Sequence, residues 1–135
     1  AMACALNNYN NALFNKSTEE VDYIQMREKQ SVVLQEIYEN IRHISSLPHQ
    51  AGQVAELLDN IERGYHKNNT VEGLLEDLDV LLQDFKTQKL PSSREEFEAR
   101  AILFYILKQL ERLLMIKREY VLDQSLRKTK VSEKA

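Results

Sequence analysis

The chain has 135 residues, of which 43% are hydrophobic and 29% charged, with only three glycines and two prolines. This composition is typical of one packed, helix-rich domain and argues against a disordered protein or a loop-rich fold. The formal net charge of −3 gives no reason to expect a nucleic acid partner, because phosphate-binding proteins normally carry a clustered basic face.

Residues 1–16 are predicted to form a connector, which folds as an extra amphipathic helix if its apolar spacing prevails. Asparagines at positions 7, 8, 10 and 11 oppose that helix, because their side chains compete for backbone hydrogen bonds. The segment Ser17, Thr18, Glu19 and Glu20 is a capping-box pattern and predicts that the first main helix begins there. That helix should end near residue 45, because residues before Pro48 are disfavoured in helical geometry.

Three further helices follow in the predicted order. Pro48 fits the first turn of a second helix that ends between Gly64 and Asn69. Thr70 is the expected cap of a third helix, which the Leu90-Pro91 pair ends. A second capping box over residues 93–96 starts the last helix, which should run to about residue 126 and leave a polar, basic tail over 127–135.

The centre of this last helix, residues 101–107, is apolar on every helical face. Such a helix must be enclosed by the rest of the protein, because only burial offsets that much exposed hydrocarbon. We therefore predict an all-α fold, an antiparallel up-down bundle of four main helices around a long C-terminal hub helix. Residues 17–126 would form the bundle domain, and the short connections favour antiparallel neighbours.

The chain itself is not expected to cross a membrane or to carry disulfides. The apolar run over 101–107 is far shorter than the roughly 20 residues that a spanning helix needs. The single cysteine, Cys4, cannot form an intramolecular disulfide and fits a reducing compartment. We therefore expect a water-soluble, cytosolic domain.

Two pairs of potential metal ligands stand at helical spacing. Glu39 and His43 are four residues apart, as are Glu62 and His66, so each pair shares one helix face. Di-iron bundles instead place glutamate and histidine three apart and add glutamates from facing helices. Ordinary surface contacts are therefore the preferred interpretation, and no metal or other cofactor is predicted.

Aromatic residues suggest a ligand site. Tyr38 on the first main helix and Phe97 and Phe104 on the last could line a cavity, with Arg100 projecting near the two phenylalanines. An arginine among rings could hold a small aromatic carboxylate by a bidentate bond and by stacking. The alternative is that the rings belong to the core and that Arg100 reaches a neighbouring glutamate.

No catalytic assembly is visible in the sequence. There is no glycine-rich phosphate loop, and Cys4 lies far in sequence from any histidine. The many carboxylates fit the solvated faces of amphipathic helices, without companions that would raise a pKa. We predict no catalytic residues and no enzyme activity.

Three segments carry a resemblance to a known family. They are residues 8–27 (NYNNALFNKSTEEVDYIQMR), residues 90–101 (LPSSREEFEARA) and residues 116–120 (IKREY). In this order they resemble the C-terminal domain of the bacterial aromatic acid exporter family. The resemblance covers nearly the whole chain, but none of the segments is a catalytic signature.

The resemblance implies an accessory role in a membrane protein. The N-terminal part of the same polypeptide would span the membrane and be the partner of this domain, which would lie on the cytoplasmic side. The domain would assemble subunits as a homo-oligomer or sense the exported acid. The alternative is a free-standing helical adaptor that offers a groove to a partner helix.

Overall fold

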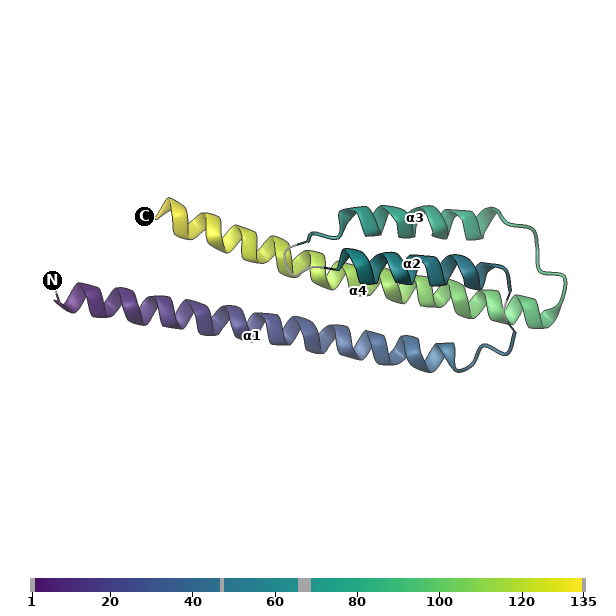
Figure 1. Cartoon of the computed structure of the whole chain (residues 1–135), viewed down its shortest axis with the longest axis horizontal. Helices are drawn as coiled ribbons and strands as arrows, with labels where there is room; N and C mark the ends of the chain where they lie inside the picture. Colours follow the sequence, from purple (N-terminus) through teal and green to yellow (C-terminus); the bar gives the residue numbers. More distant parts are fainter. Residues whose placement is uncertain (1, 47, 66–68, 135) are drawn as a thin grey trace.

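The computed structural model describes residues 2–46, 48–65 and 69–134, with side chains from residue 5 onward. Four helices make up the fold: α1 (Met2–Ile41), α2 (Gln50–Gly64), α3 (Glu72–Thr87) and α4 (Arg94–Glu133). Consecutive helices run in opposite directions, and α1 and α4 lie side by side along the long axis (Figure 1). No strand occurs in the described ranges, so the predicted all-α bundle is confirmed.

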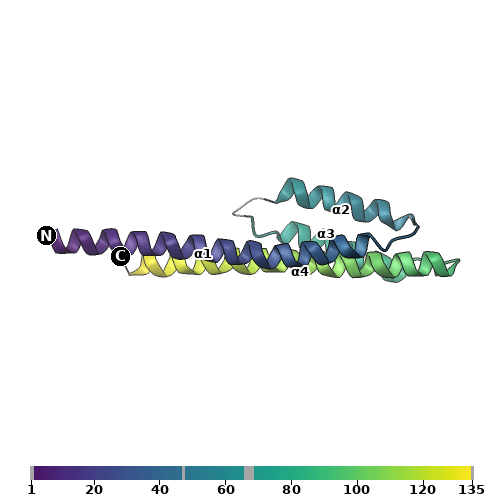
Figure 2. The same cartoon turned by 90° about the horizontal axis from the view of Figure 1, so that it is seen from below.

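The two long helices extend far beyond the shorter pair. Each has 40 residues, which at about 1.5 Å per residue is roughly 60 Å. The α2–α3 hairpin covers this pair only near the end where α1 stops and α4 begins, as Figures 1 and 2 show. We call the covered part the body, and the uncovered part, residues 2–25 of α1 with residues 119–133 of α4, the arm.

The core lies in the body, around α4. This helix contacts all three others, whereas α1 packs chiefly against α4. Leucines or isoleucines recur on α4 at spacings of three and four, so that one broad face of the helix is apolar. Those buried in the core are Leu103, Ile106, Leu107, Leu110, Leu113 and Leu114.

The predicted hub is enclosed on most sides but not on all. Within the apolar run, Leu103, Ile106 and Leu107 are buried, whereas Ala101 is exposed and Tyr105 is 56% exposed. The reason is that α1 and the hairpin cover adjacent sides of α4 and leave one strip of its surface open. The all-round burial expected from the sequence is therefore only partly correct.

The predicted helix start at Ser17 is wrong. In the structure α1 is continuous from Met2, and the Thr18 hydroxyl donates to the carbonyl of Phe14 at 3.0 Å instead of capping a first turn. No glycine or proline interrupts residues 2–41. Extending a formed helix costs little compared with nucleating one, so the asparagine-rich turns stay helical.

The predicted tail after residue 126 is also helical, because α4 continues to Glu133. The Thr129 hydroxyl donates to the Ser125 carbonyl at 3.0 Å within this last stretch. As in α1, no glycine or proline is present to stop the helix. The two ends of the chain thus extend as the arm.

The two other predicted caps have different outcomes. Thr70 does not cap α3, because the backbone N–H of Val71 instead donates to the side-chain oxygen of Asn69 at 2.8 Å. The cap at Ser93 is confirmed, since its hydroxyl accepts a bond from the N–H of Glu96 at 3.1 Å. The Glu96 carboxylate in turn accepts bonds from the backbone and hydroxyl of Ser92, which lower the pKa of Glu96.

Candidate functional site

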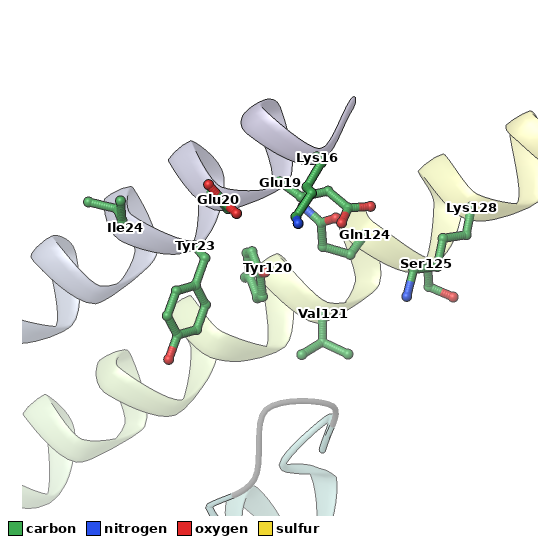
Figure 3. A pocket seen from close by; sticks show the side chains of 10 residues that line it. All are labelled: Lys16, Glu19, Glu20, Tyr23, Ile24, Tyr120, Val121, Gln124, Ser125 and Lys128. Atoms are coloured by element: carbon green, nitrogen blue, oxygen red, sulfur yellow. The ribbon is translucent and has the colours of Figure 1, made fainter. Parts of the chain in front are cut away.

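A groove of about 700 Å³ runs between the two helices of the arm, and we call it the arm groove. Figure 3 shows its side chains, which come from α1 and α4. The residues of α1 that line it are Lys16, Glu19, Glu20, Tyr23 and Ile24. Those of α4 are Tyr120, Val121, Gln124, Ser125 and Lys128.

Two tyrosines form the floor of the arm groove. The rings of Tyr23 and Tyr120 meet edge to face, with their centroids 6.0 Å apart and their planes at 61°. This is a favourable arrangement for aromatic pairs, and it fixes the register of the two helices. Burial raises the pKa of Tyr120, and the nearby charges of Glu19 and Asp22 raise it further.

The rim of the arm groove carries both signs of charge. Two lysines, Lys16 and Lys128, stand with two glutamates, Glu19 and Glu20. Burial is the main cause that raises the pKa of Tyr120, and the negative charge of Glu19 adds to it, so the groove is not a strongly positive site for an anion. The arm groove is therefore an amphipathic surface, with charged side chains at its rim and aromatic side chains at its centre.

Ion pairs close the arm beside the groove. Asp22 of α1 pairs with Arg127 of α4 and also accepts a hydrogen bond from Gln124 at 3.4 Å. Arg127 lies within 3.4 Å of Asp123 on its own helix. These contacts hold the two helices together where the apolar core has ended.

A buried polar cluster lies where the arm joins the body. The Gln30 amide donates to the hydroxyl of Tyr65 and, at 3.4 Å, to the carbonyl of Leu113, while Arg27 donates to the Gln30 oxygen at 3.3 Å. The Nζ of Lys117 lies 3.6 Å from the centroid of the Tyr65 ring, a cation–π contact. Tyr65 thereby connects the end of α2 to both long helices.

Burial controls ionisation in this cluster. Lys117 is only 1% exposed, and its desolvation, with a smaller contribution from the charge of Arg27, lowers the pKa of its ammonium group. Desolvation also raises the pKa of Tyr65. Gln30 and Lys117 have almost no contact with solvent, whereas Tyr65 is half-buried and Arg27 is exposed, so only the centre of the cluster is enclosed.

The structure places the four predicted ligand residues apart from the arm groove. Tyr38 and Phe97 are largely exposed, and Phe104 packs partly buried against the core. The guanidinium of Arg100 donates to the Lys89 carbonyl at 2.6 Å and lies 3.8 Å from the Glu96 carboxylate. This contact with Glu96 corresponds to the alternative role predicted for Arg100, in which it reaches a neighbouring glutamate.

The predicted metal-ligand pairs are found at the surface. Glu39 forms an ion pair with Arg42 at 3.7 Å, and His43 lies exposed in the turn after α1. Glu62 is exposed on α2, and His66 lies outside the described residues. Among the described residues, no three or more His, Cys, Asp or Glu side chains are grouped so as to hold a metal ion.

Sequence reasoning missed both the arm groove and the buried cluster. One signal was available for the cluster, because Lys117 continues the three-and-four spacing of the leucines on α4. Gln30 likewise lies between Met26 and Val33 on the buried stripe of α1. The groove had no local signal, because it depends on the register between two helices that are about 100 residues apart in the sequence.

Within the described ranges, every helix falls short of the length or hydrophobicity needed to cross a lipid bilayer. This agrees with the short apolar run noted in the sequence.

Comparisons with known proteins give the family. The family described as "Putative aromatic acid exporter C-terminal domain" matches residues 1–118. The "Uncharacterized protein YqjA" of Bacillus subtilis (strain 168) is 36% identical over 95 residues, which are 70% of this chain but only 30% of that relative. No solved structure matches the chain. The resemblance of the three sequence segments is thus confirmed, and the chain belongs to the aromatic acid exporter C-terminal domain family.

Proposed function

We propose that this chain is the accessory C-terminal domain of a bacterial membrane exporter and that it lies on the cytoplasmic side of the membrane. The observation that carries the proposal is the family match, which extends over residues 1–118. The 95 residues aligned with the relative from B. subtilis make up only 30% of that protein, so most of it lies outside the aligned region. A membrane-spanning part of the same polypeptide is the partner that this arrangement requires.

The role that we favour is assembly of exporter subunits. The arm presents apolar and mixed-charge surface, whereas Lys117 and Gln30, at the centre of the polar cluster, are buried. The second role is sensing of a small aromatic carboxylate at Tyr38, Phe97, Arg100 and Phe104. The existing contacts of Arg100 weaken that version, because a ligand would have to displace them.

The coding region upstream of this domain provides the first test. Several hydrophobic stretches of about 20 residues there would support the exporter. A start codon at Met2 would instead support the free-standing adaptor.

Limited proteolysis of the full-length protein tests the cytoplasmic location. Trypsin should cut after the exposed Lys89, in the connection between α3 and α4, in inverted membrane vesicles but not in intact spheroplasts. Cleavage in intact spheroplasts would place the domain on the outer side and contradict the proposal.

A titration with benzoate tests the sensing version separately. Saturable amide shifts near Arg100 that disappear in an Arg100→Ala variant would support it. Absence of any saturable shift would remove the sensing role and leave the assembly role in place.

A further inference from the structure

We infer that the arm groove is an interface for a second copy of this chain, so that two arms pack into one four-helix bundle. The inference rests on the proposed assembly role and names the surface that performs it. It does not require that the assembled protein transport any particular compound.

The face of α4 that lines the arm groove continues the face that is buried in the body. The buried face of α4 includes Leu103, Leu107, Leu110, Leu114 and Lys117, at alternating spacings of four and three. Val121, Gln124 and Lys128 continue the same spacing into the arm groove, so they lie on the same helix face.

The corresponding face of α1 also continues from the body into the arm groove. Ile37, Gln30, Tyr23 and Lys16 follow one another at intervals of seven residues, which keeps them on nearly the same side of the helix. The first two are buried in the body, and the last two line the arm groove.

In the body, other helices cover the apolar faces of the two long helices. There the α2–α3 hairpin packs on α4, and Tyr65 reaches both long helices. The hairpin ends at the level of Arg118, which forms an ion pair with Glu72 at 2.7 Å. Among the described residues, only α1 and α4 continue beyond that level, and Figure 2 shows them side by side there. A second arm would supply two more helices and restore the four of the body.

The charges of the arm groove also favour a second copy as its partner. An interface with twofold symmetry uses the same patch on both partners, so the patch must be complementary to itself. The arm groove meets this condition, because its rim carries two lysines and two glutamates around an aromatic and aliphatic centre. A predominantly acidic or basic groove would repel its own copy.

Exposed apolar side chains extend along the arm beyond the arm groove. Leu6, Tyr9 and Leu13 continue the α1 wall of the arm groove, and they are 59%, 62% and 49% exposed. The arm has about 24 residues of α1 and about 15 of α4, which at about 1.5 Å per residue and about 10 Å of width per helix give a face of roughly 600 Å² per copy. This approaches the ~800 Å² per partner of a standard stable interface.

The first experiment measures the mass of the purified chain by light scattering over a wide range of concentration. We expect a dimer that dissociates on dilution. An Ile24→Arg substitution in the arm groove should weaken the dimer by about tenfold or more, because it places a charge at the apolar centre. Val80→Arg is the matched control, since Val80 is also an exposed β-branched helical residue but lies on α3.

A charge-reversal pair distinguishes contacts between copies from contacts within one chain. The acidic variant Lys16→Glu/Lys128→Glu and the basic variant Glu19→Lys/Glu20→Lys should each be monomeric. When mixed, they should form a one-to-one heterodimer, because each then meets the opposite charge. Circular dichroism of each variant checks that the helices are intact.

A wild-type chain that stays monomeric at every concentration would overturn the inference. So would a mixture of the two charge variants that remains monomeric although the wild type dimerises. A monomer would leave the exporter proposal standing, because the upstream coding region and the proteolysis of the full-length protein test that separately.

Discussion

Lys117 illustrates what a single residue does when it occupies a core position of a helix. Its four-carbon chain fills a place on the buried stripe of α4, while its ammonium group is directed to the face of Tyr65. Such a lysine contributes packing as well as charge, and its charge is the part that burial disfavours.

A Lys117→Met substitution tests this effect through pH. Because the pKa of Lys117 is lowered in the folded protein, the unfolded chain binds the proton of this lysine more tightly. The contribution of Lys117 to the free energy of unfolding therefore rises with pH, up to the ordinary lysine pKa of 10.5. The unfolding free energy of the wild type relative to Lys117→Met should therefore increase between about pH 7 and pH 10. Urea unfolding at a series of pH values measures this difference.

Tyr65 and Tyr120, whose raised pKa values act in the opposite direction at high pH, are present in both proteins and largely cancel. Lys130→Met removes an exposed lysine from the same helix and serves as the control, because solvent surrounds that side chain. A pH-independent difference for Lys117→Met would mean that the ammonium group is not desolvated.

At the scale of elements, two similar capping patterns have opposite outcomes. Both residues 17–20 and residues 93–96 place a hydroxyl before glutamates, but only Ser93 caps a helix. Pro91 prevents a helix from entering α4 from the preceding turn, whereas the residues before Ser17 are free to continue α1. A cap pattern therefore marks a helix start only where the preceding backbone cannot be helical.

A Ser93→Ala substitution should lower the free energy of unfolding by about 1 kcal/mol, because the N–H of Glu96 loses its acceptor. The measurement is denaturant unfolding followed by circular dichroism. Ser31→Ala, at an exposed position within α1, is the matched control and should change stability by less than about 0.5 kcal/mol. Equal effects of the two substitutions would show that the cap contributes nothing specific.

This contrast indicates how far the sequence predicts the structure. The approximate positions of α2 and α3, the start of α4 and the Ser93 cap follow from local spacing and from breakers such as Pro91, whereas the end of α4 and the cap of α3 do not. The length of α1 did not, because no breaker stands between the asparagines and Thr18. The arm groove could not be predicted either, since it arises from the alignment of Tyr23 with Tyr120 across the whole fold.

At the scale of the whole molecule, the body and the arm differ in how they are stabilised. The body has a four-helix cross-section with side chains such as Leu78 and Leu107 fully buried. The arm has two helices joined by a tyrosine pair and ion pairs, and its outermost residues, such as Leu6 and Phe14, are exposed. Local stability should therefore fall along α1 from the body toward Met2.

Amide hydrogen exchange should reveal this gradient. At low protein concentration, amides in the first turns of α1 should exchange fastest, and those around Leu107 and Leu110 slowest, because opening the core requires global unfolding. Protection in the arm should rise as concentration increases if a second copy covers it. Uniform protection along α1 at low concentration would contradict the division into body and arm.

The uninterrupted course of α1 has a mechanical consequence. A helix of this length with no glycine or proline lacks a built-in hinge, so it bends only gently. Because α1 packs along α4, a tilt imposed on α1 where it enters the body is passed to α4, on which the hairpin also packs.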